Sequence, residues 1–203
     1  MRKLWNRILL CAVLASAVWG FGLMADREVL KEELIRFHVV ANSDSREDQE
    51  VKLQVRDAVI AGIGAELEKI ADAQEAKLYL QKNLPKIQQL ANDTLVAAGF
   101  EPTAVVSLCR EAFDTRVYDT FALPAGVYEA LRITIGEGKG HNWWCVTFPG
   151  LCLPATSDGF KAEAAGAGFS DTLTETLTGE EGYEVRFFLL DALGTLENMF
   201  FAG

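Results

Sequence analysis

The chain has 203 residues and half of them are hydrophobic, which is enough for one well-filled domain and excludes a disordered chain. Its 29 acidic residues against 19 basic ones give a formal charge of −10. A body this acidic repels phosphate backbones and anionic lipid, so we exclude nucleic acid as a partner.

The first 25 residues have the pattern of an export leader. Three basic residues precede an apolar run from Ile8 to about Ala25. A basic end followed by an apolar run is typical of a signal peptide, and Ala15-Ser16-Ala17 satisfies the small-residue rule for cleavage. The run is also just long enough to remain in the membrane as an anchor. We therefore predict that residues 1–25 are a signal peptide or membrane anchor, and that the protein contacts the membrane only through them.

Residues 26–153 begin with one extended run and two helical patterns. The run from Leu34 to Ala41 is rich in β-branched residues and ends in the turn-forming residues 42–45. Apolar residues then recur every three or four positions, which predicts helices over about Glu47–Ile70 and from Asp72 to Gly99. Each helix has a capping residue before it, Ser45 or Asp72, with an acidic residue three positions later.

Strands are predicted after the two helices. They cover Ala104–Ala112, a segment near Val117–Leu123, and Val127–Ile135, with a tight turn at residues 124–126. A strand, two helices and then several strands joined by short connections is typical of an α+β fold. We expect an antiparallel or mixed sheet with two long helices packed on one face, as a single domain core over residues 26–153.

The C-terminal part changes composition. Residues 154–182 are small or polar without a sustained period, which predicts a flexible linker or loop. Within residues 183–203, the segment Glu184–Leu190 is apolar on both faces towards its end and is predicted to be an interior strand. A short helix through Leu193, Leu196 and Met199 would follow, and the two elements would complete the domain.

The stretch Pro124–Cys152 concentrates the chemically distinctive side chains. It contains the glycine-rich segment Gly136–Gly140, followed by a histidine, two tryptophans and two cysteines. Glycines let backbone amides turn around a phosphate, but this spacing fits neither the P-loop nor the dinucleotide pattern. Glu137 would also oppose an anion, so we interpret the glycines as loop geometry.

The cysteines favour a disulfide. Cys145 and Cys152 are seven residues apart, and outside the cytoplasm a close cysteine pair is usually oxidised. Cys109 is a third thiol that could compete for the pairing, so the identity of the pair stays open. An oxidised Cys145 could not act as a nucleophile beside His141, and we expect no catalytic residue, cofactor or metal.

Zinc is the competing interpretation of the same residues. His38, His141, Cys145 and Cys152 have the ligand types of a four-coordinate site. The alternative function is therefore an exported zinc-dependent hydrolase that uses His38, His141 and Cys145 or Cys152. Metal analysis together with a thiol count would separate this alternative from the disulfide.

The two tryptophans are adjacent in the sequence. On extended backbone, Trp143 and Trp144 point to opposite sides. We expect one to enter the core and the other to be available to a partner, because exposed indole beside a polar loop is typical of a protein-binding hot spot.

Several segments together resemble one known family. The matching segments are Arg36–Ser45, Leu123–Gly126, Tyr128–Ile133, Ile135–Cys145 and the pairs Phe148-Pro149 and Leu151-Cys152. In these segments the chain is similar to the stage II sporulation protein R family of endospore-forming bacteria. The segment from Pro154 onward fits that family less well.

The resemblance implies a signalling protein and not an enzyme. Members are made in the forespore and exported into the space between the two membranes around it. There they trigger a membrane-embedded aspartic protease of the mother cell, which removes the pro-sequence from the sigma-E precursor. Our hypothesis is that a loop held by a Cys145–Cys152 disulfide contacts this protease. Its candidate contact residues are Glu137, Lys139, His141, Asn142, Trp143 and Trp144.

Overall fold

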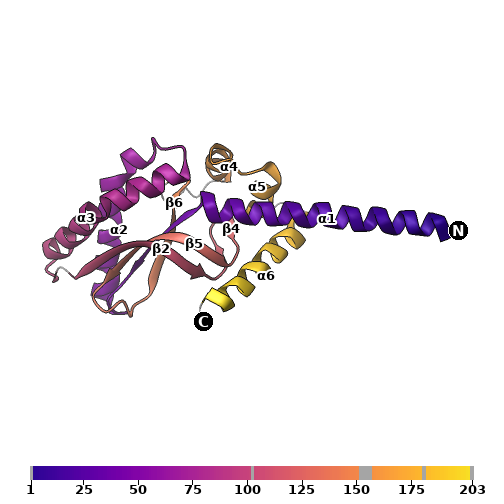
Figure 1. The fold of residues 1–203 in the computed structure, drawn as a ribbon. Coiled ribbons are helices and arrows are strands. Elements are labelled where there is room, and N and C mark those ends of the chain that lie inside the picture. Colours follow the sequence, from indigo (N-terminus) through magenta and orange to yellow (C-terminus); the bar gives the residue numbers. More distant parts are fainter. Residues whose placement is uncertain (1, 102, 151–156, 180–181, 202–203) are drawn as a thin grey trace.

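The computed structural model describes residues 2–101, 103–150, 157–179 and 182–201 (Figure 1). Its elements in chain order are α1 (Arg2–Glu33), β1 (Ile35–Val40), α2 (Arg46–Leu67), α3 (Ala73–Ala97), β2 (Ala104–Phe113), β3 (Arg116–Val117), β4 (Ala122–Leu123), β5 (Gly126–Ile135), β6 (Asn142–Phe148), α4 (Ser157–Gly166), α5 (Asp171–Thr178) and α6 (Glu184–Phe201).

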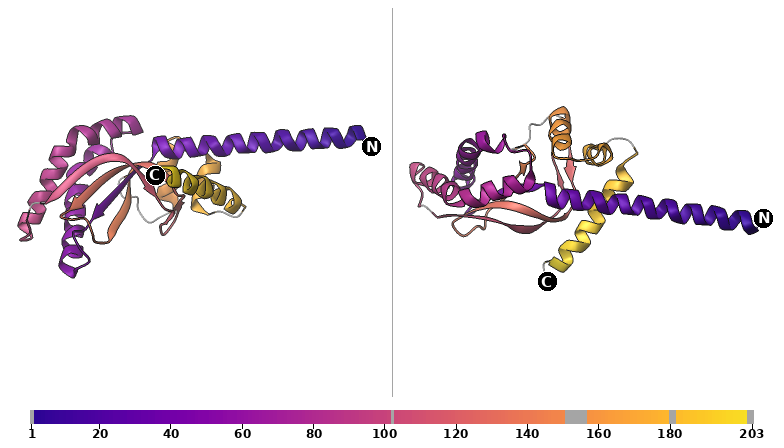
Figure 2. Two further views of the ribbon diagram at one scale, coloured as in Figure 1. Left: turned by 60° about the horizontal axis from the view of Figure 1, so that its bottom comes forward. Right: turned by 45° about the horizontal axis from the view of Figure 1, so that its top comes forward.

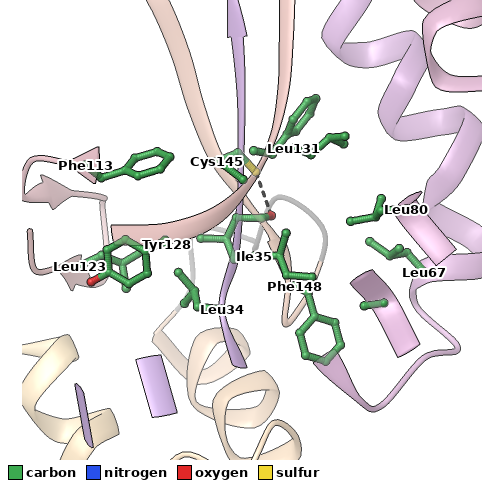
Figure 3. Packing of buried hydrophobic residues seen from close by; sticks show 14 of the residues in the cluster. Leu34, Ile35, Leu67, Leu80, Phe113, Leu123, Tyr128, Leu131, Cys145 and Phe148 are labelled. Atoms are coloured by element: carbon green, nitrogen blue, oxygen red, sulfur yellow. Dashed lines mark hydrogen bonds between the residues drawn. The ribbon is translucent and has the colours of Figure 1, made fainter. Parts of the chain in front are cut away.

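One four-stranded sheet organises the domain. Its strand order is β2-β5-β1-β6, with β1 parallel to β5 and the other two pairings antiparallel. This mixed sheet confirms the predicted α+β class. The segment near residues 117–123 does not join it, because β3 and β4 pair only with each other. Figure 3 shows the apolar packing around β1, including Leu34, Ile35 and Leu131.

The two long helices α2 and α3 pack against each other and against the sheet (Figures 1 and 2). The predicted caps are confirmed, because the Ser45 hydroxyl accepts the Asp48 N–H at 3.1 Å and the Asp72 carboxylate accepts the Glu75 N–H at 2.8 Å. The apolar stripe is buried along α2, which ends at Leu67 and not at about Ile70 as predicted. Its members are Val51, Val55, Val59, Ile63 and Leu67.

The prediction of a flexible linker over residues 154–182 is wrong where the structure describes it. Residues 157–179 form α4 and α5, while residues 154–156 and 180–181 lie outside the described part. The two helices bury Phe160, Ala164, Leu173 and Leu177, and the Phe160 ring stacks on Phe121 at 4.2 Å between ring centroids. Each helix is too short to show a sustained period, and packing stabilises such short helices more than propensity does.

The predicted strand Glu184–Leu190 is also wrong, because these residues are the first half of the single helix α6. The short helix expected after it is the second half. The buried positions of α6 are Leu190 and Gly194, which are four residues apart and therefore lie on one side of a helix. A short apolar run gives no reliable period, so it does not distinguish a strand from a helix.

Helix α1 continues past residue 25 without a break and ends at Glu33. By length and composition it could cross a membrane. Its apolar side chains are exposed from Leu4 to Phe21, whereas Leu23, Asp26 and Leu30 are buried against the domain. The C-terminal part of this helix is therefore an integral part of the fold.

We predict that Gly194→Ala destabilises the protein by about 1–3 kcal/mol, the usual cost of overpacking. A Cβ at this position would overlap the carbonyl oxygen of Ala125, so α6 would have to move away from the start of β5. Alanine has a higher helix propensity than glycine, so the substitution by itself would stabilise α6. A loss of stability would therefore come from the overlap with Ala125. The measurement is thermal or urea unfolding.

The control is Gly166→Ala at the end of α4, where an added Cβ meets nothing within 4 Å. This variant should be as stable as the wild type or slightly more stable. Equal stability of both variants would contradict close packing of α6 on Ala125.

Candidate functional site

The glycine loop, residues Gly136–His141, connects β5 to β6. Because β1 lies between these two strands in the sheet, the loop passes over the C-terminal end of β1. There it meets the turn of residues 42–45, which leads from β1 into α2. Two segments far apart in the sequence therefore form one surface.

Backbone hydrogen bonds hold the loop on this turn. The side-chain oxygen of Asn42 accepts the Glu137 N–H at 3.0 Å, and the Asn42 carbonyl accepts the Lys139 N–H at 3.1 Å. The Gly140 N–H donates to the carbonyl of Ala41 at 3.0 Å. These loop amides already have acceptors within the chain, which supports loop geometry over a phosphate cradle.

The backbone of His141 is held by hydrogen bonds, whereas its imidazole ring is exposed to solvent. Asp44 accepts the His141 N–H at 2.6 Å and lies 2.5 Å from its Nδ1. The backbone hydrogen bond is the main reason why the pKa of Asp44 is lowered. The buried ammonium of Lys52, on α2, donates to the His141 carbonyl at 2.9 Å. The imidazole itself is 82% exposed.

Glycine is required at two positions of the loop for different reasons. Gly138 has a φ of 62°, in the left-handed region that other residues rarely adopt. At Gly140 a Cβ would overlap the carbonyl oxygen of Ser43. The loop therefore has a defined conformation and close backbone contact with the turn.

Three of the six predicted contact residues project from this fixed backbone. The side chains of Glu137 and Lys139 are 68% and 74% exposed and pair with each other at 2.6 Å. Together with the ring of His141 they form an exposed polar surface, whereas Asn142 is half-buried. The result is a preorganised loop with exposed charges at its tip.

The two tryptophans face opposite sides of β6, as predicted, but both pack against the protein. Trp143 lies edge-on to Phe37, and the Arg56 guanidinium lies 4.8 Å from its ring centroid. Trp144 stacks on the His38 ring at 4.8 Å and is covered by Arg116 at 4.5 Å. The expectation that one indole is free is wrong, because an arginine covers each half-buried ring.

His38 belongs to a polar cluster that our sequence analysis missed. Its Nε2 lies 3.0 Å from one carboxylate oxygen of Glu111, and Arg132 lies 3.4 Å from the other. The Cys109 thiol donates to the same carboxylate at 3.3 Å. These residues come from three strands, and only the strand register brings them together, so no local pattern could identify the cluster.

The electrostatics of this cluster are those of a structural site. Burial would raise the pKa of Glu111, but His38, Cys109 and Arg132 outweigh it and lower the pKa to about 2. Burial, followed by the hydrogen bond to Glu111, raises the pKa of the Cys109 thiol. A protonated thiol beside an ionised carboxylate is a poor nucleophile.

The predicted zinc ligands are not brought together in the described residues. His38 shares a sheet face with Trp144, which stacks on it, whereas Cys145 is the next residue of β6 and points to the other face. His141 is in the loop beside Asp44. In the described part of the chain, no three His, Cys, Asp or Glu side chains are placed to hold a metal ion. The zinc-hydrolase alternative therefore has no support.

The cysteines are partly described. Cys145 is buried in β6, with its sulfur 3.2 Å from the carbonyl oxygen of Val146. Cys11 and Cys109 carry free thiols. Cys152 lies outside the described residues, so the predicted pairing of Cys145 with Cys152 stays a prediction.

The chain was compared with known proteins. The family model described as Stage II sporulation protein R matches residues 31–158. The Stage II sporulation protein R of Bacillus subtilis (strain 168) is 33% identical, over 83% of this chain and 83% of its own length. No solved structure matches the chain.

We predict that Glu111→Gln destabilises the protein at neutral pH and that the difference from the wild type shrinks in acid. The pKa of this carboxyl falls on folding from its usual 4.5 to about 2. Its contribution is therefore present above about pH 4.5 and is lost as the pH falls towards about 2. Urea unfolding at neutral pH and at about pH 3 measures the difference.

Glu66→Gln is the matched control, since Glu66 forms an exposed ion pair with Lys69. Exposed pairs contribute little, so this variant should change stability only slightly at either pH. A Glu111→Gln variant as stable as the wild type at neutral pH would show that the cluster adds no net stability.

Proposed function

The chain belongs to the stage II sporulation protein R family, and from this membership we propose that it is an exported sporulation signal. Its proposed action is to activate a membrane-embedded aspartic protease of the mother cell, so that the protease processes the sigma-E precursor. The observation that carries the proposal is the glycine loop, which presents exposed side chains on a backbone fixed by Asn42 and Asp44.

A fixed loop suits a protein that acts by binding. Ordering a flexible loop on association costs free energy, and a preformed loop avoids part of that cost. The loop also carries both charges and an imidazole within six residues, which allows specific pairing with a partner surface. The partner would contact polar side chains at the loop tip. Trp143 and Trp144 would instead pack against the protein and stabilise β6, the strand that follows the loop.

The protonation states in the polar cluster suit a structural role for these residues. Among the described side chains of the cluster, the Cys109 thiol is held protonated and Glu111 is held ionised by its neighbours. A protonated thiol can donate a hydrogen bond and an ionised carboxylate can accept it, so these protonation states stabilise the contacts between the strands of the cluster. The chemistry would belong to the partner protease.

Helix α1 supports export from the forespore into the space between the two membranes. Its N-terminal basic residues and exposed apolar surface are those of a leader or anchor. Outside the cytoplasm a disulfide is stable, and the free thiols of Cys11 and Cys109 leave Cys145 and Cys152 as the proposed pair. This bond would fix the segment that follows β6.

A charge exchange tests the loop as the contact surface. In Glu137→Lys/Lys139→Glu the two residues can still pair with each other, so the loop keeps its local ion pair while its charge pattern is reversed. We expect processing of the sigma-E precursor in sporulating cells to fall by on the order of tenfold, as for a repulsive contact of about 1.4 kcal/mol. Immunoblots of the precursor and the mature form measure it.

The control is the same exchange at Glu66→Lys/Lys69→Glu, an equally exposed pair at the opposite end of α2. Processing should be normal with this variant. Normal processing with the loop exchange, in a protein of wild-type stability, would exclude these two charges as contacts. Trp144→Ala is less informative, because removing the indole uncovers His38 and Arg116.

Thiol alkylation followed by mass measurement tests the proposed disulfide. Without reduction, the exported protein should take up two alkyl groups if α1 is intact, on Cys11 and Cys109, and one if the leader is removed. Reduction should expose two further thiols. Uptake of all groups without reduction would contradict the disulfide, and the intact mass shows at the same time whether the leader is cleaved.

A further inference from the structure

The helix α6 turns its charged side chains towards the protein. The Arg186 guanidinium donates to Asp26 of α1, with the Nε–Oδ2 distance at 2.9 Å. Glu197 pairs with Arg27 at 2.7 Å and with Lys31 at 3.2 Å. Further polar contacts of this inward side reach the start of β5 and the end of β2. Among them, Asp191 accepts the Ala125 N–H at 2.7 Å, and Asn198 donates to the Phe113 carbonyl at 2.8 Å.

The outward side of α6 is apolar. Its large side chains are between 51% and 80% exposed. They are Val185, Phe188, Leu196, Met199 and Phe200. Ala192 and Thr195 complete this face, and no charged side chain of the described residues lies on it after Glu184. A surface helix normally has the opposite arrangement, and an exposed apolar patch of this kind marks an interaction surface.

The position of α6 relates this face to a membrane. In Figures 1 and 2, α6 lies between the sheet and the free length of α1, so α1 projects from the domain on the side of α6 away from the sheet. The free length of α1 is apolar and exposed and could cross a membrane. The first charged residue after its apolar run is Asp26, which binds Arg186 near the beginning of α6.

No flexible segment separates the two parts of α1, because the helix is continuous to Glu33. The point at which α1 would leave a bilayer is thus within about one helical turn, or about 5 Å, of its contact with α6. Helix α6 is therefore held close to the point where α1 would leave the bilayer, at its beginning through Arg186 and near its end through Glu197. The inward ion pairs with Asp26, Arg27 and Lys31 fix the relative position of the two helices.

We propose that the outward face of α6 lies on the lipid bilayer and is a second membrane contact of this protein besides α1. This face would lie at the boundary between the lipid headgroups and the acyl chains, where amphipathic helices bind by burying apolar surface. The net charge of −10 offers no attraction to anionic headgroups, and the outward face is uncharged. Contact therefore requires neither anionic lipid nor low salt. This goes beyond our expectation that the leader is the only membrane contact, and it does not depend on the proposed function.

Site-specific fluorescence in the full chain tests this contact. The free thiols are removed by Cys11→Ser and Cys109→Ser, and the fluorophore NBD is attached at Phe188→Cys or at Met199→Cys. Val96→Cys, an exposed apolar position at the C-terminal end of α3, is the matched control. Each chain is reconstituted into phosphatidylcholine vesicles without anionic lipid. The background chain without an added cysteine measures nonspecific labelling.

We expect blue-shifted emission at positions 188 and 199, severalfold quenching by spin-labelled lipid, and severalfold slower reduction by dithionite than at position 96. High salt should change none of these. Equal dithionite rates at all three positions with no lipid quenching would overturn the proposal. Protection without lipid quenching, lost when the protein is diluted in lipid, would show that a second copy covers the face, and would also overturn it. Wild-type thermal unfolding of each variant confirms the fold.

Discussion

The pairing of β1 with β5 on one side and β6 on the other is the interaction on which the rest of the structure depends. All six residues of β1 are buried, including the cationic Arg36. Its guanidinium lies 4.1 Å from the Phe113 ring centroid and donates to the Tyr118 hydroxyl at 3.2 Å. Stacking on aromatic faces compensates part of the cost of burying this charge, and it connects β1 to β2 and to the β3–β4 hairpin.

The central position of β1 also separates the two surfaces for which we propose a function, the glycine loop and the outward face of α6. The strand begins two residues after α1 ends, and its far end carries the turn on which the glycine loop rests. Six residues of strand span about 20 Å. The apolar helix α6 lies beside α1, and the polar loop lies at the opposite end of β1. A domain seated on one membrane by α1 and α6 would thus direct its loop away from that membrane.

The elements with strong local signals could be predicted from the sequence. The strand at residues 35–40 and helices α2 and α3 have clear periodicity, and their caps are contacts between residues three positions apart. The exposed members of the loop were also identifiable, because the glycines mark the loop. The turn at residues 42–45 was predicted as well, but its contact with the loop was not, since Asp44 and His141 are 97 residues apart and no periodicity relates them.

The sequence by itself determined the apolar N-terminal segment, the long helices, the main strands and the position of the glycine loop, because each depends on neighbours within a few residues. Only the tertiary structure decided that α4 and α5 fold where a linker was expected and that residues 184–190 are helical. It also decided which way α6 turns its charges and that Glu111 meets His38. These features depend on surfaces supplied by distant segments: Phe121 packs on α4, and Asp26 with Ala125 fixes α6. A short apolar run contains no information about which surface it will meet.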